Sequence, residues 1–291
     1  MKNIAGKTLW LFILSLLLLY FACSLEIDKG NHKSLNSVSK DINNCKPQSF
    51  ISTIKSDIVT SEERDLKLLT KAKGMIRKIE TSDPEKVLFL TFDACGQGGL
   101  SDGYDSLLVD YLIKEQIPAT FFISRRWALK NIKYLDYIIE NGVNIDIQNH
   151  GTQHIPLSSV GDSVYSVVGT KGLREVHYEV ETAAVFLCEK LGEKPKLFRP
   201  GTAHADDIAV SYVNAMGYQV ISYSVLGDGG ATFTKELIKE NILKAKNGDI
   251  ILLHFNHPES DVFLGVNEAV EELRKMGNIK FGIIYDYLSN R

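Results

Sequence analysis

From Val87 to the carboxyl terminus, short apolar runs alternate with longer amphipathic stretches, and this alternation constrains the fold more than any other feature. Short apolar runs are typical of buried strands, and longer amphipathic stretches are typical of helices that cover a sheet. Their alternation predicts a mostly parallel sheet with helices outside it. Polar clusters follow nearly every strand and could meet at one mouth. We therefore predict a curved α/β barrel, complete or incomplete, rather than an open sheet.

The predicted strands are the apolar runs Val87–Phe92, Ala119–Ile123, Val143–Ile147, Leu197–Phe198, Gln219–Tyr223, Ile250–Leu253 and Lys280–Ile283. The predicted helices are the amphipathic stretches Tyr104–Glu115, Trp127–Asn141, Leu173–Leu191, Asp206–Met216, Thr234–Ala245 and Phe263–Met276.

Two histidines, His150 and His154, directly follow one of the predicted strands. Gly151 and Pro156 forbid a long helix here, so both histidines lie just beyond the carboxyl end of the strand. Imidazoles at this spacing can point the same way and share a divalent metal such as Zn²⁺. A solvated turn is the alternative interpretation of so short a motif. Because α/β proteins collect their ligands at the carboxyl ends of strands, we predict a metal-binding pair.

Other strand ends carry residues suited to acid-base chemistry. Asp93 follows the first strand and could serve as a base or a metal ligand, and Arg199 precedes a rigid turn and could keep that carboxylate ionised. Asp228 lies in a tight turn, where it is either functional or a turn former. His254 ends the sixth strand and is a natural general acid.

These residues carry a family resemblance. The motifs, in chain order, are Thr91-Phe92-Asp93, His150-x-x-x-His154, Arg199-Pro200-Gly201, Asp228 and Leu253-His254. Their order resembles that of the polysaccharide deacetylase family with the NodB-type homology domain, over about Val87 to Ile284. The first motif, Thr-Phe-Asp-Ala-Cys-Gly, resembles one bacterial subgroup of that family.

The resemblance implies a distorted (β/α)₇ barrel that removes acetyl groups from N-acetylated sugars of a polysaccharide with a divalent metal, most simply Zn²⁺. It also implies a role for each matching residue. These roles are the general base for Asp93, metal ligands for His150 and His154, orientation of the base for Arg199, protonation of the leaving amine for His254, and support of Arg199 or His254 for Asp228.

One position departs from the family pattern. The family has a second Asp after the base, which is its third metal ligand, and this sequence has Ala94 there. Asp93 itself could reach the metal, a nearby Cys95, Asp102 or Asp105 could substitute, or a water could complete a weaker site. We expect Asp93 near the metal. The departure also motivates a second function, a non-catalytic glycan-binding surface lipoprotein on the same fold. A third, a hydrolase of a non-sugar amide, is considered because related barrels can act on ureide-like substrates.

The amino terminus has the pattern of a secretory signal. Lys2 and Lys7 precede an uncharged, Leu-rich run from Thr8 to Leu25. Ala22 before Cys23 resembles a lipoprotein processing site, while an uncleaved anchor or ordinary cleavage are the alternatives. The protein is therefore expected to be exported and membrane-anchored, in the periplasm or at the cell surface. The expected organisation is a signal peptide over 1–23, a flexible linker over 24–59, a helical extension over 60–83 and a catalytic domain over 84–291.

The helical extension is predicted from a capping box at Thr60 and apolar spacing up to Glu80. Lipidation of Cys23 would leave Cys45, Cys95 and Cys188, so at most one disulfide could form within the chain. Cys188 lies in an apolar helical run, and we expect it to be buried and reduced.

The composition limits the partners. A net charge of −3 without a basic block argues against nucleic acid. The exported location favours peptidoglycan, an exopolysaccharide or a chitin-like glycan as substrate. Trp127, Tyr165 and Tyr223 could stack on sugar rings or pack in the core.

Overall fold

The computed structural model describes residues 45–51 and 67–289. The predicted signal segment with Cys23, and most of the predicted linker, lie outside these ranges. Within them, no helix combines the length and the apolar composition that crossing a membrane would require.

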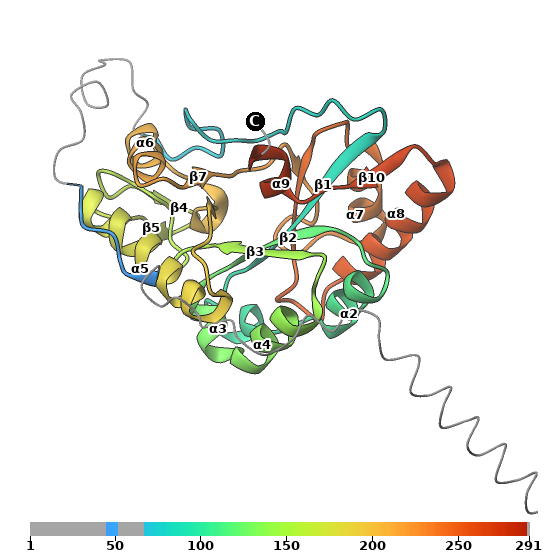
Figure 1. The fold of residues 1–291 in the computed structure, drawn as a ribbon, viewed down its shortest axis with the longest axis horizontal. Helices are drawn as coiled ribbons and strands as arrows, with labels where there is room; N and C mark the ends of the chain where they lie inside the picture. The colour runs from blue at the N-terminus through green and yellow to red at the C-terminus, as the bar shows by residue number, and fades with distance from the viewer. Residues whose placement is uncertain (1–44, 52–66, 290–291) are drawn as a thin grey trace, which may run out of the picture. The chain divides into compact units, whose positions relative to one another are not determined.

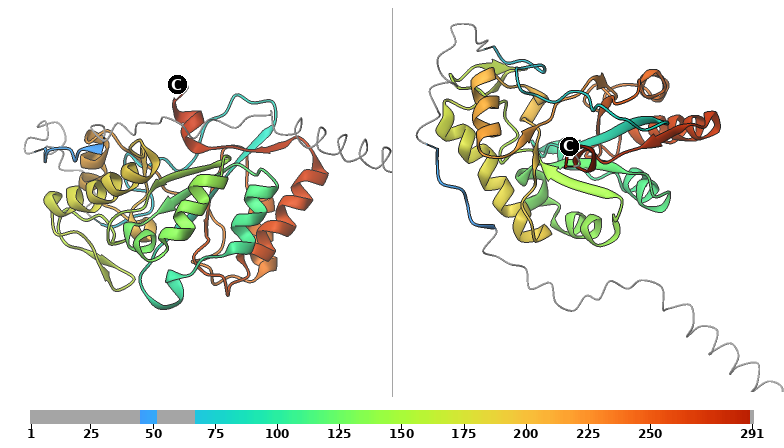
Figure 2. Two further views of the ribbon diagram at one scale, coloured as in Figure 1. Left: turned by 60° about the horizontal axis from the view of Figure 1, so that its bottom comes forward. Right: turned by 45° about the horizontal axis from the view of Figure 1, so that its top comes forward.

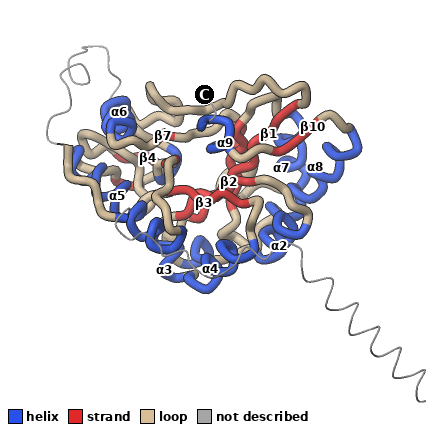
Figure 3. Tube along the Cα trace, viewed as in Figure 1, coloured by secondary structure: helices blue, strands red, loops and turns tan. Residues whose placement is uncertain are grey.

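A parallel sheet forms the centre of the domain (Figures 1 and 3). Its strands run in the order β7-β6-β3-β2-β1-β9-β8, and β10 pairs with the amino-terminal half of β1. The bounds are β1 Lys86–Ala94, β2 Ala119–Ile123, β3 Ile145–Asn149, β6 Leu197–Phe198, β7 Gln219–Val220, β8 Val225–Leu226, β9 Ile250–His254 and β10 Ile279–Phe281. A separate antiparallel hairpin consists of β4 Ser163–Val164 and β5 Val167–Val168. β8 and this hairpin, whose strands have two residues each, were not predicted.

Helices surround the sheet (Figure 2). The bounds are α2 Ser106–Lys114, α3 Arg125–Lys130, α4 Ile132–Asn141, α5 Leu173–Leu191, α6 Asp207–Ala215, α7 Lys235–Lys244, α8 Val262–Met276 and α9 Ile284–Ser289. Each predicted helix between Tyr104 and Met276 is present, but the stretch predicted as one helix from Trp127 to Asn141 is divided at Asn131. The buried amide of Asn131 donates to the carbonyls of Asp102 and Trp127, which fixes the break.

The sheet curls into an incomplete barrel, so the predicted α/β barrel is confirmed in its distorted form. β7 and β8 lie at the two ends of the strand order, and the chain joins them through residues 221–224. A segment of turns and isolated bridges, residues 67–80, lies beside this junction. Ile76 N–H donates to the Val220 carbonyl at 2.8 Å, and Ile79 N–H donates to the Gly248 carbonyl at 2.8 Å.

The predicted helix from Thr60 to Glu80 is wrong over its described part, because residues 67–80 form turns and isolated bridges and no helix. The apolar residues that suggested a helical face are distributed along the barrel instead. Leu69 and Ile76 each form an isolated bridge, to Ala205 and Ile221, and Ile79 is buried. The segment supplies hydrogen-bond partners to strand edges that would otherwise lack them, and this gain outweighs the local preference for a helix.

Strand register brings the predicted site residues to one edge of the sheet. β1 is buried from Val87 to Ala94, as expected for a central parallel strand that is covered on both faces. Asp93 lies directly opposite His254 of β9. Asn149, the last residue of β3, lies opposite Phe198 of β6. The residues that follow these strands therefore emerge at a common mouth.

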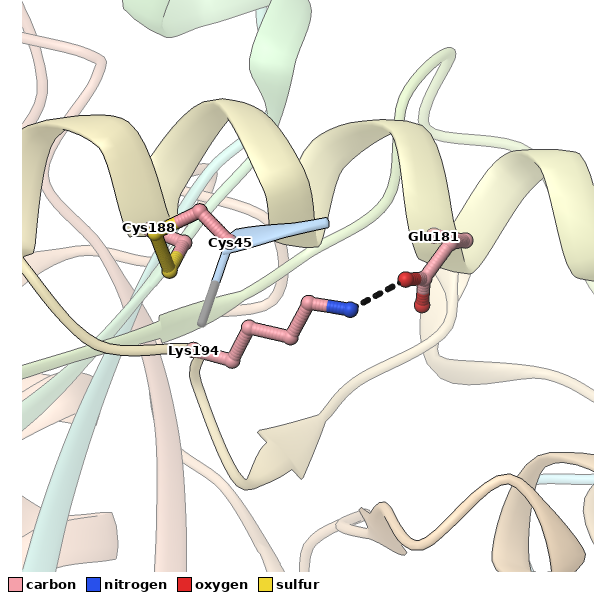
Figure 4. Close-up of a disulfide and its surroundings, with 4 residues drawn as sticks. All are labelled: Cys45, Glu181, Cys188 and Lys194. Carbon is pink, nitrogen blue, oxygen red and sulfur yellow. Dashed lines mark hydrogen bonds and ion pairs between the residues drawn. A yellow bond between two sulfur atoms is a disulfide. The ribbon is translucent and has the colours of Figure 1, made fainter. Parts of the chain in front are cut away.

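A disulfide joins Cys45 to Cys188 of α5 (Figure 4). The expectation that Cys188 is buried is correct, but the expectation that it is reduced is wrong, and Cys95 is the free cysteine of the described residues. Gln48 N–H donates to Glu181 of α5 at 2.6 Å, so residues 45–51 lie against the helix although the sequence suggested a flexible linker here. Glu181 also forms an ion pair with Lys194.

We predict that replacing both cysteines, Cys45→Ser with Cys188→Ser, lowers the free energy of unfolding by about 2–4 kcal/mol. The disulfide spans a sequence separation of 143 residues, so it restricts the unfolded chain strongly. Urea unfolding with and without a reductant measures the effect. The reductant should lower the stability of the wild type and leave that of the double variant unchanged. Thiol labelling of Cys188 in the native, unreduced protein would contradict the disulfide.

Candidate active site

A buried ion pair joins Asp93, at the end of β1, to Arg199, directly after β6. Arg199 Nη1 donates to Asp93 Oδ1 at 2.7 Å, and both side chains are buried. Burial alone would raise the pKa of Asp93, but the charge of Arg199, with that of His254, outweighs burial and lowers the pKa below its usual value. Asp93 is therefore an ionised carboxylate that can accept a proton.

The guanidinium of Arg199 is held on several sides. It donates to Thr91 Oγ1 at 2.9 Å and to the Ser222 carbonyl at 3.2 Å, and it lies over the Phe122 ring, 4.1 Å from the centroid. These contacts compensate for the cost of burying the charge. The Arg199 side chain thus links the ends of β1 and β6 to the chain that follows β7.

His150 presents an unpartnered nitrogen to the same space. Its Nδ1 lies 2.9 Å from the Arg199 carbonyl. Because a carbonyl only accepts, Nδ1 carries the proton and Nε2 carries a lone pair. Nε2 is buried without a hydrogen-bond partner, and it lies 3.3 Å from Asp93 Oδ2. Burial lowers the pKa of His150, which favours the neutral ring that a metal requires.

Three donor side chains form the candidate metal centre. One ligand atom from each of His150, His154 and Cys95 lies within 4.8 Å of the others, and all three residues are buried. Burial would raise the pKa of the Cys95 thiol, but the charges and hydrogen bonds of His154 and His254 lower it to about 7. The thiolate is the form that binds metals, so the donors fit a divalent metal that accepts nitrogen and sulfur ligands.

The resemblance implies a second aspartate directly after Asp93, and the structure shows which residues lie there instead. Ala94 is buried in β1, and Cys95, one residue later, lies beside the two histidines. We expected Asp93 to lie near the metal, and it does contact His150, but Cys95 is the residue that groups with both histidines. Asp102 pairs with Lys130 at the surface and Asp105 caps α2, so neither reaches the cluster.

His254 and Asp228 form the second charged pair. His254 Nδ1 lies 3.0 Å from Asp228 Oδ1, and Asp228 is fully buried. Burial would lower the pKa of His254, but the charge and hydrogen bond of Asp228 outweigh it and raise the pKa well above its usual value. His254 is therefore protonated near neutral pH. Asp228 contacts His254 rather than Arg199, which decides between the two alternatives of the sequence analysis.

These groups open into one pocket of about 400 Å³. Its lining includes charged or metal-ligating side chains and aromatic or aliphatic ones. The polar members are Asp93, Cys95, His154, Thr202, His204 and His254, and the aromatic or aliphatic members include Tyr165, Tyr223, Leu226 and Phe233. Tyr165 and Tyr223 are thus placed to contact a ligand. Trp127 is fully buried and donates to the Gly103 carbonyl, so it belongs to the core.

Glu179 of α5 braces the loop that carries His154. Its carboxylate accepts from Gln153 N–H at 2.9 Å and from Ile155 N–H at 3.4 Å, and it is buried. This role was not predicted. The pattern that could have indicated it is that Glu179, a charged residue, lies on the same face of α5 as the apolar Val176 and Val180. A buried carboxylate needs partners, and here the partners are backbone amides.

The turn after Arg199 packs directly against the same loop. A Cβ placed on Gly201 would lie 2.3 Å from the carbonyl carbon of His154, so only glycine fits. The side chain of His154 has a partner as well, since Gln97 Nε2 lies 2.7 Å from His154 Nδ1. Gln97 was also missed, because its contact depends on the path of a glycine-rich loop that spacing does not define.

Comparisons with known proteins bear on the family and the fold. A family model for polysaccharide deacetylase matches residues 80–221. No curated protein is similar enough in sequence to match. The structure of PdaA from Bacillus subtilis, a family 4 carbohydrate esterase, is 22% identical, with a TM-score of 0.60 over 75% of this chain and 86% of that chain.

Two further structures share the fold. The Bc1960 peptidoglycan N-acetylglucosamine deacetylase is 18% identical, with a TM-score of 0.60 over 74% of this chain and 92% of that chain. BA3943 from Bacillus anthracis, described as a family 4 pseudoenzyme, is 21% identical, with a TM-score of 0.56 over 71% of this chain and 66% of that chain. The family model supports a polysaccharide deacetylase domain over residues 80–221, and these structures show that the chain shares their fold.

We predict that Cys95→Ala weakens zinc binding by on the order of 10-fold or more, because it removes one of three protein ligands. Competition with a chromogenic chelator measures the affinity, and plasma mass spectrometry measures the metal content. Asp102→Asn is the matched control, since Asp102 lies nearby at the surface and should leave the affinity unchanged. Equal affinities for wild type and Cys95→Ala would show that Cys95 is not a ligand.

Proposed function

We propose that the protein is a metal-dependent hydrolase that removes acetyl groups from N-acetylated sugars of a cell-wall or extracellular polysaccharide. The observation that supports this most is that two charged pairs lie side by side. Asp93 pairs with Arg199, His254 pairs with Asp228, and Asp93 and His254 are opposite each other in the sheet. The cluster of His150, His154 and Cys95 lies beside them. An ionised base and a protonated acid then line one pocket, as amide hydrolysis requires.

The metal would be held by His150, His154 and Cys95. Two imidazoles and a thiolate suit Zn²⁺ better than Mg²⁺ or Ca²⁺, which prefer oxygen ligands. When bound, such an ion supplies Lewis-acid polarisation of the substrate carbonyl and lowers the pKa of water. His150 is prepared for this role, since its Nδ1 proton is directed to the Arg199 carbonyl and its Nε2 has no other partner.

The acid-base steps belong to the two charged pairs. Asp93 accepts the proton of the attacking water, and Arg199 keeps the Asp93 carboxylate oriented through its contact with Oδ1. His254 then donates a proton to the leaving nitrogen as the bond to the carbonyl carbon breaks, while Asp228 stabilises the imidazolium. The products are acetate and a free amino sugar.

A non-catalytic glycan-binding protein is the second candidate. Ala94 in the place of the family ligand favours it, and one structure with this fold is a pseudoenzyme by its description. A hydrolase of a non-sugar amide would retain the same catalytic groups. Acetate release from N-acetylated oligosaccharides, lost in His150→Ala, distinguishes the deacetylase from both alternatives.

We also propose that the protein is exported and anchored to a membrane through Cys23 or the apolar amino terminus. The disulfide between Cys45 and Cys188 supports export, since such bonds persist mainly in oxidising compartments. A polymer of the cell envelope, such as peptidoglycan, or an exopolysaccharide or chitin-like glycan, would then be the accessible substrate. Metabolic labelling with a palmitate analogue, lost in Cys23→Ser, tests the anchor.

We predict that Asp93→Asn reduces turnover by on the order of 10²-fold or more, the usual range for loss of a general base. Metal content should stay near that of the wild type, because Cys95 and the histidines form the cluster. Acetate release and metal analysis of the same preparation measure both quantities. Loss of metal in parallel with activity would show that Asp93 is chiefly a ligand.

We predict that Asp228→Asn moves the alkaline limb of the pH–rate profile to lower pH. Asp228 raises the pKa of His254, and activity requires protonated His254, so activity falls as pH rises through that pKa. Removing the Asp228 charge lowers the pKa, while the acidic limb, set by Asp93, should stay in place. Asp136→Asn, the same change at an exposed ion pair, is the control. An unmoved alkaline limb would exclude His254 as the acid.

A further inference from the structure

We propose that Asn256 is a positioning residue for Cys95, the thiol of the candidate metal centre. The Asn256 side chain, which follows β9, holds the loop between β1 and α2 in place, and this loop directs the thiol to His150 and His154. The inference rests on the proposed metal-dependent function and deepens it, because it names the residue that joins the strand of His254 to the loop of Cys95.

The loop that carries Cys95 is organised around Ser101. The Ser101 carbonyl accepts from Gly96 N–H at 3.1 Å, and the Ser101 hydroxyl accepts from Gln97 N–H at 2.9 Å. The two residues that follow Cys95 are thus held by one serine. The direction of the Cys95 thiol therefore depends on where Ser101 lies.

Asn256 holds Ser101 from the neighbouring strand end. Asn256 Nδ2 donates to the Ser101 carbonyl at 2.7 Å, and Asn256 is fully buried. Asn256 lies two residues beyond His254, the last residue of β9, and β9 pairs with β1, which leads into the loop. One side chain thus connects the segments that carry the proposed acid and the proposed thiolate ligand.

The Cys95 backbone is held on its other side as well. Ser124 Oγ donates to the Cys95 carbonyl at 2.6 Å, and Ser124 is fully buried. A Cβ placed on Gly96 would lie 2.4 Å from the Trp127 backbone nitrogen, so the loop packs closely against α3. Because the main chain is fixed on both sides of Cys95, loss of either contact would give the thiol more freedom.

The Asn256 amide uses only its donor. Its Oδ1 is buried and has no hydrogen-bond partner among the described residues. A buried acceptor without a partner destabilises a fold, and an apolar side chain of the same shape avoids that cost. The Ser101 carbonyl would still accept from Gly96 N–H without Asn256. Stability alone therefore does not explain an amide at this position, whereas its contact with Ser101 does.

The test replaces Asn256 with leucine, which has a similar shape and cannot donate. All proteins are full-length and carry Cys23→Ser, so Cys95 is the free thiol beside the Cys45–Cys188 disulfide. The probe is Co²⁺, because a thiolate ligand adds a charge-transfer absorption that imidazole ligands do not give. Asn256→Leu should lose most of this absorption per bound Co²⁺. Its Kd for Zn²⁺ should rise on the order of 10-fold, as expected when a residue that orients a metal ligand is removed.

Asn144 offers a matched control. Its Nδ2 donates to the Leu112 carbonyl at 3.0 Å, and its Oδ1 is also buried without a partner among the described residues. It directly precedes β3, at the end of the sheet opposite the mouth. Asn144→Leu should therefore keep the wild-type absorption and Kd. Asn256→Ala, which removes the donor without adding bulk, should repeat the effect of Asn256→Leu.

Wild-type absorption and affinity in both Asn256 variants would overturn the proposal, and so would losses no larger than those of Asn144→Leu. Thiol labelling of the metal-free proteins separates the proposal from the proposed function. In a wild type that binds no metal and releases no acetate, the hydrolase would be contradicted. Faster labelling of Cys95 in Asn256→Leu than in Asn144→Leu would then still support positioning by Asn256, and equal rates would overturn it.

Discussion

The buried pair of Asp93 and Arg199 is the interaction on which the rest of the site depends. Two charges removed from water are tolerated only when their remaining hydrogen-bonding groups are nearly all satisfied. Thr91, Ser222 and the Phe122 ring meet most of this demand, and each lies on a different segment of the barrel. The chain must therefore close around Arg199 for the pair to be stable. The Arg199 carbonyl then fixes the tautomer of His150, so one residue organises both Asp93, the proposed base, and His150, a proposed metal ligand.

Much of the fold could be predicted because it follows from burial. Central parallel strands are apolar on both faces, and Ala119–Ile123 and the helix Leu173–Leu191 have the bounds that the sequence indicates. The failures have physical causes. Lys67–Glu80 has helical spacing, but its backbone groups pair with strand edges far away in the sequence. The partner of Cys188 could not be identified, since Cys45 is distant in the chain and lies in polar sequence.

The candidate site could be predicted only in part, for the same reason. Asp93 and His254 lie at the ends of β1 and β9, and His150 comes directly after β3. Because the sheet fixes the register of these strands, the topology brings the three residues close together. Cys95 and Gln97 lie on a glycine-rich loop whose path no periodicity defines, and Glu179 acts from a helix through backbone amides. The spacing of residues in the sequence does not indicate the path of a loop or a contact between a side chain and the main chain. The contacts of Cys95, Gln97 and Glu179, which complete the site, are of these kinds.

The glycine at position 201 has a consequence for engineering. Since any side chain there would collide with the main chain of His154, a library that varies residues 201 to 204 should keep this position fixed. Variation at Thr202 and His204, which line the pocket, would then sample ligand contacts while the loop that carries His154 keeps its shape. In this turn, Gly201 is required for the backbone to pack, whereas Thr202 and His204 are positions at which substitutions could change the ligand specificity.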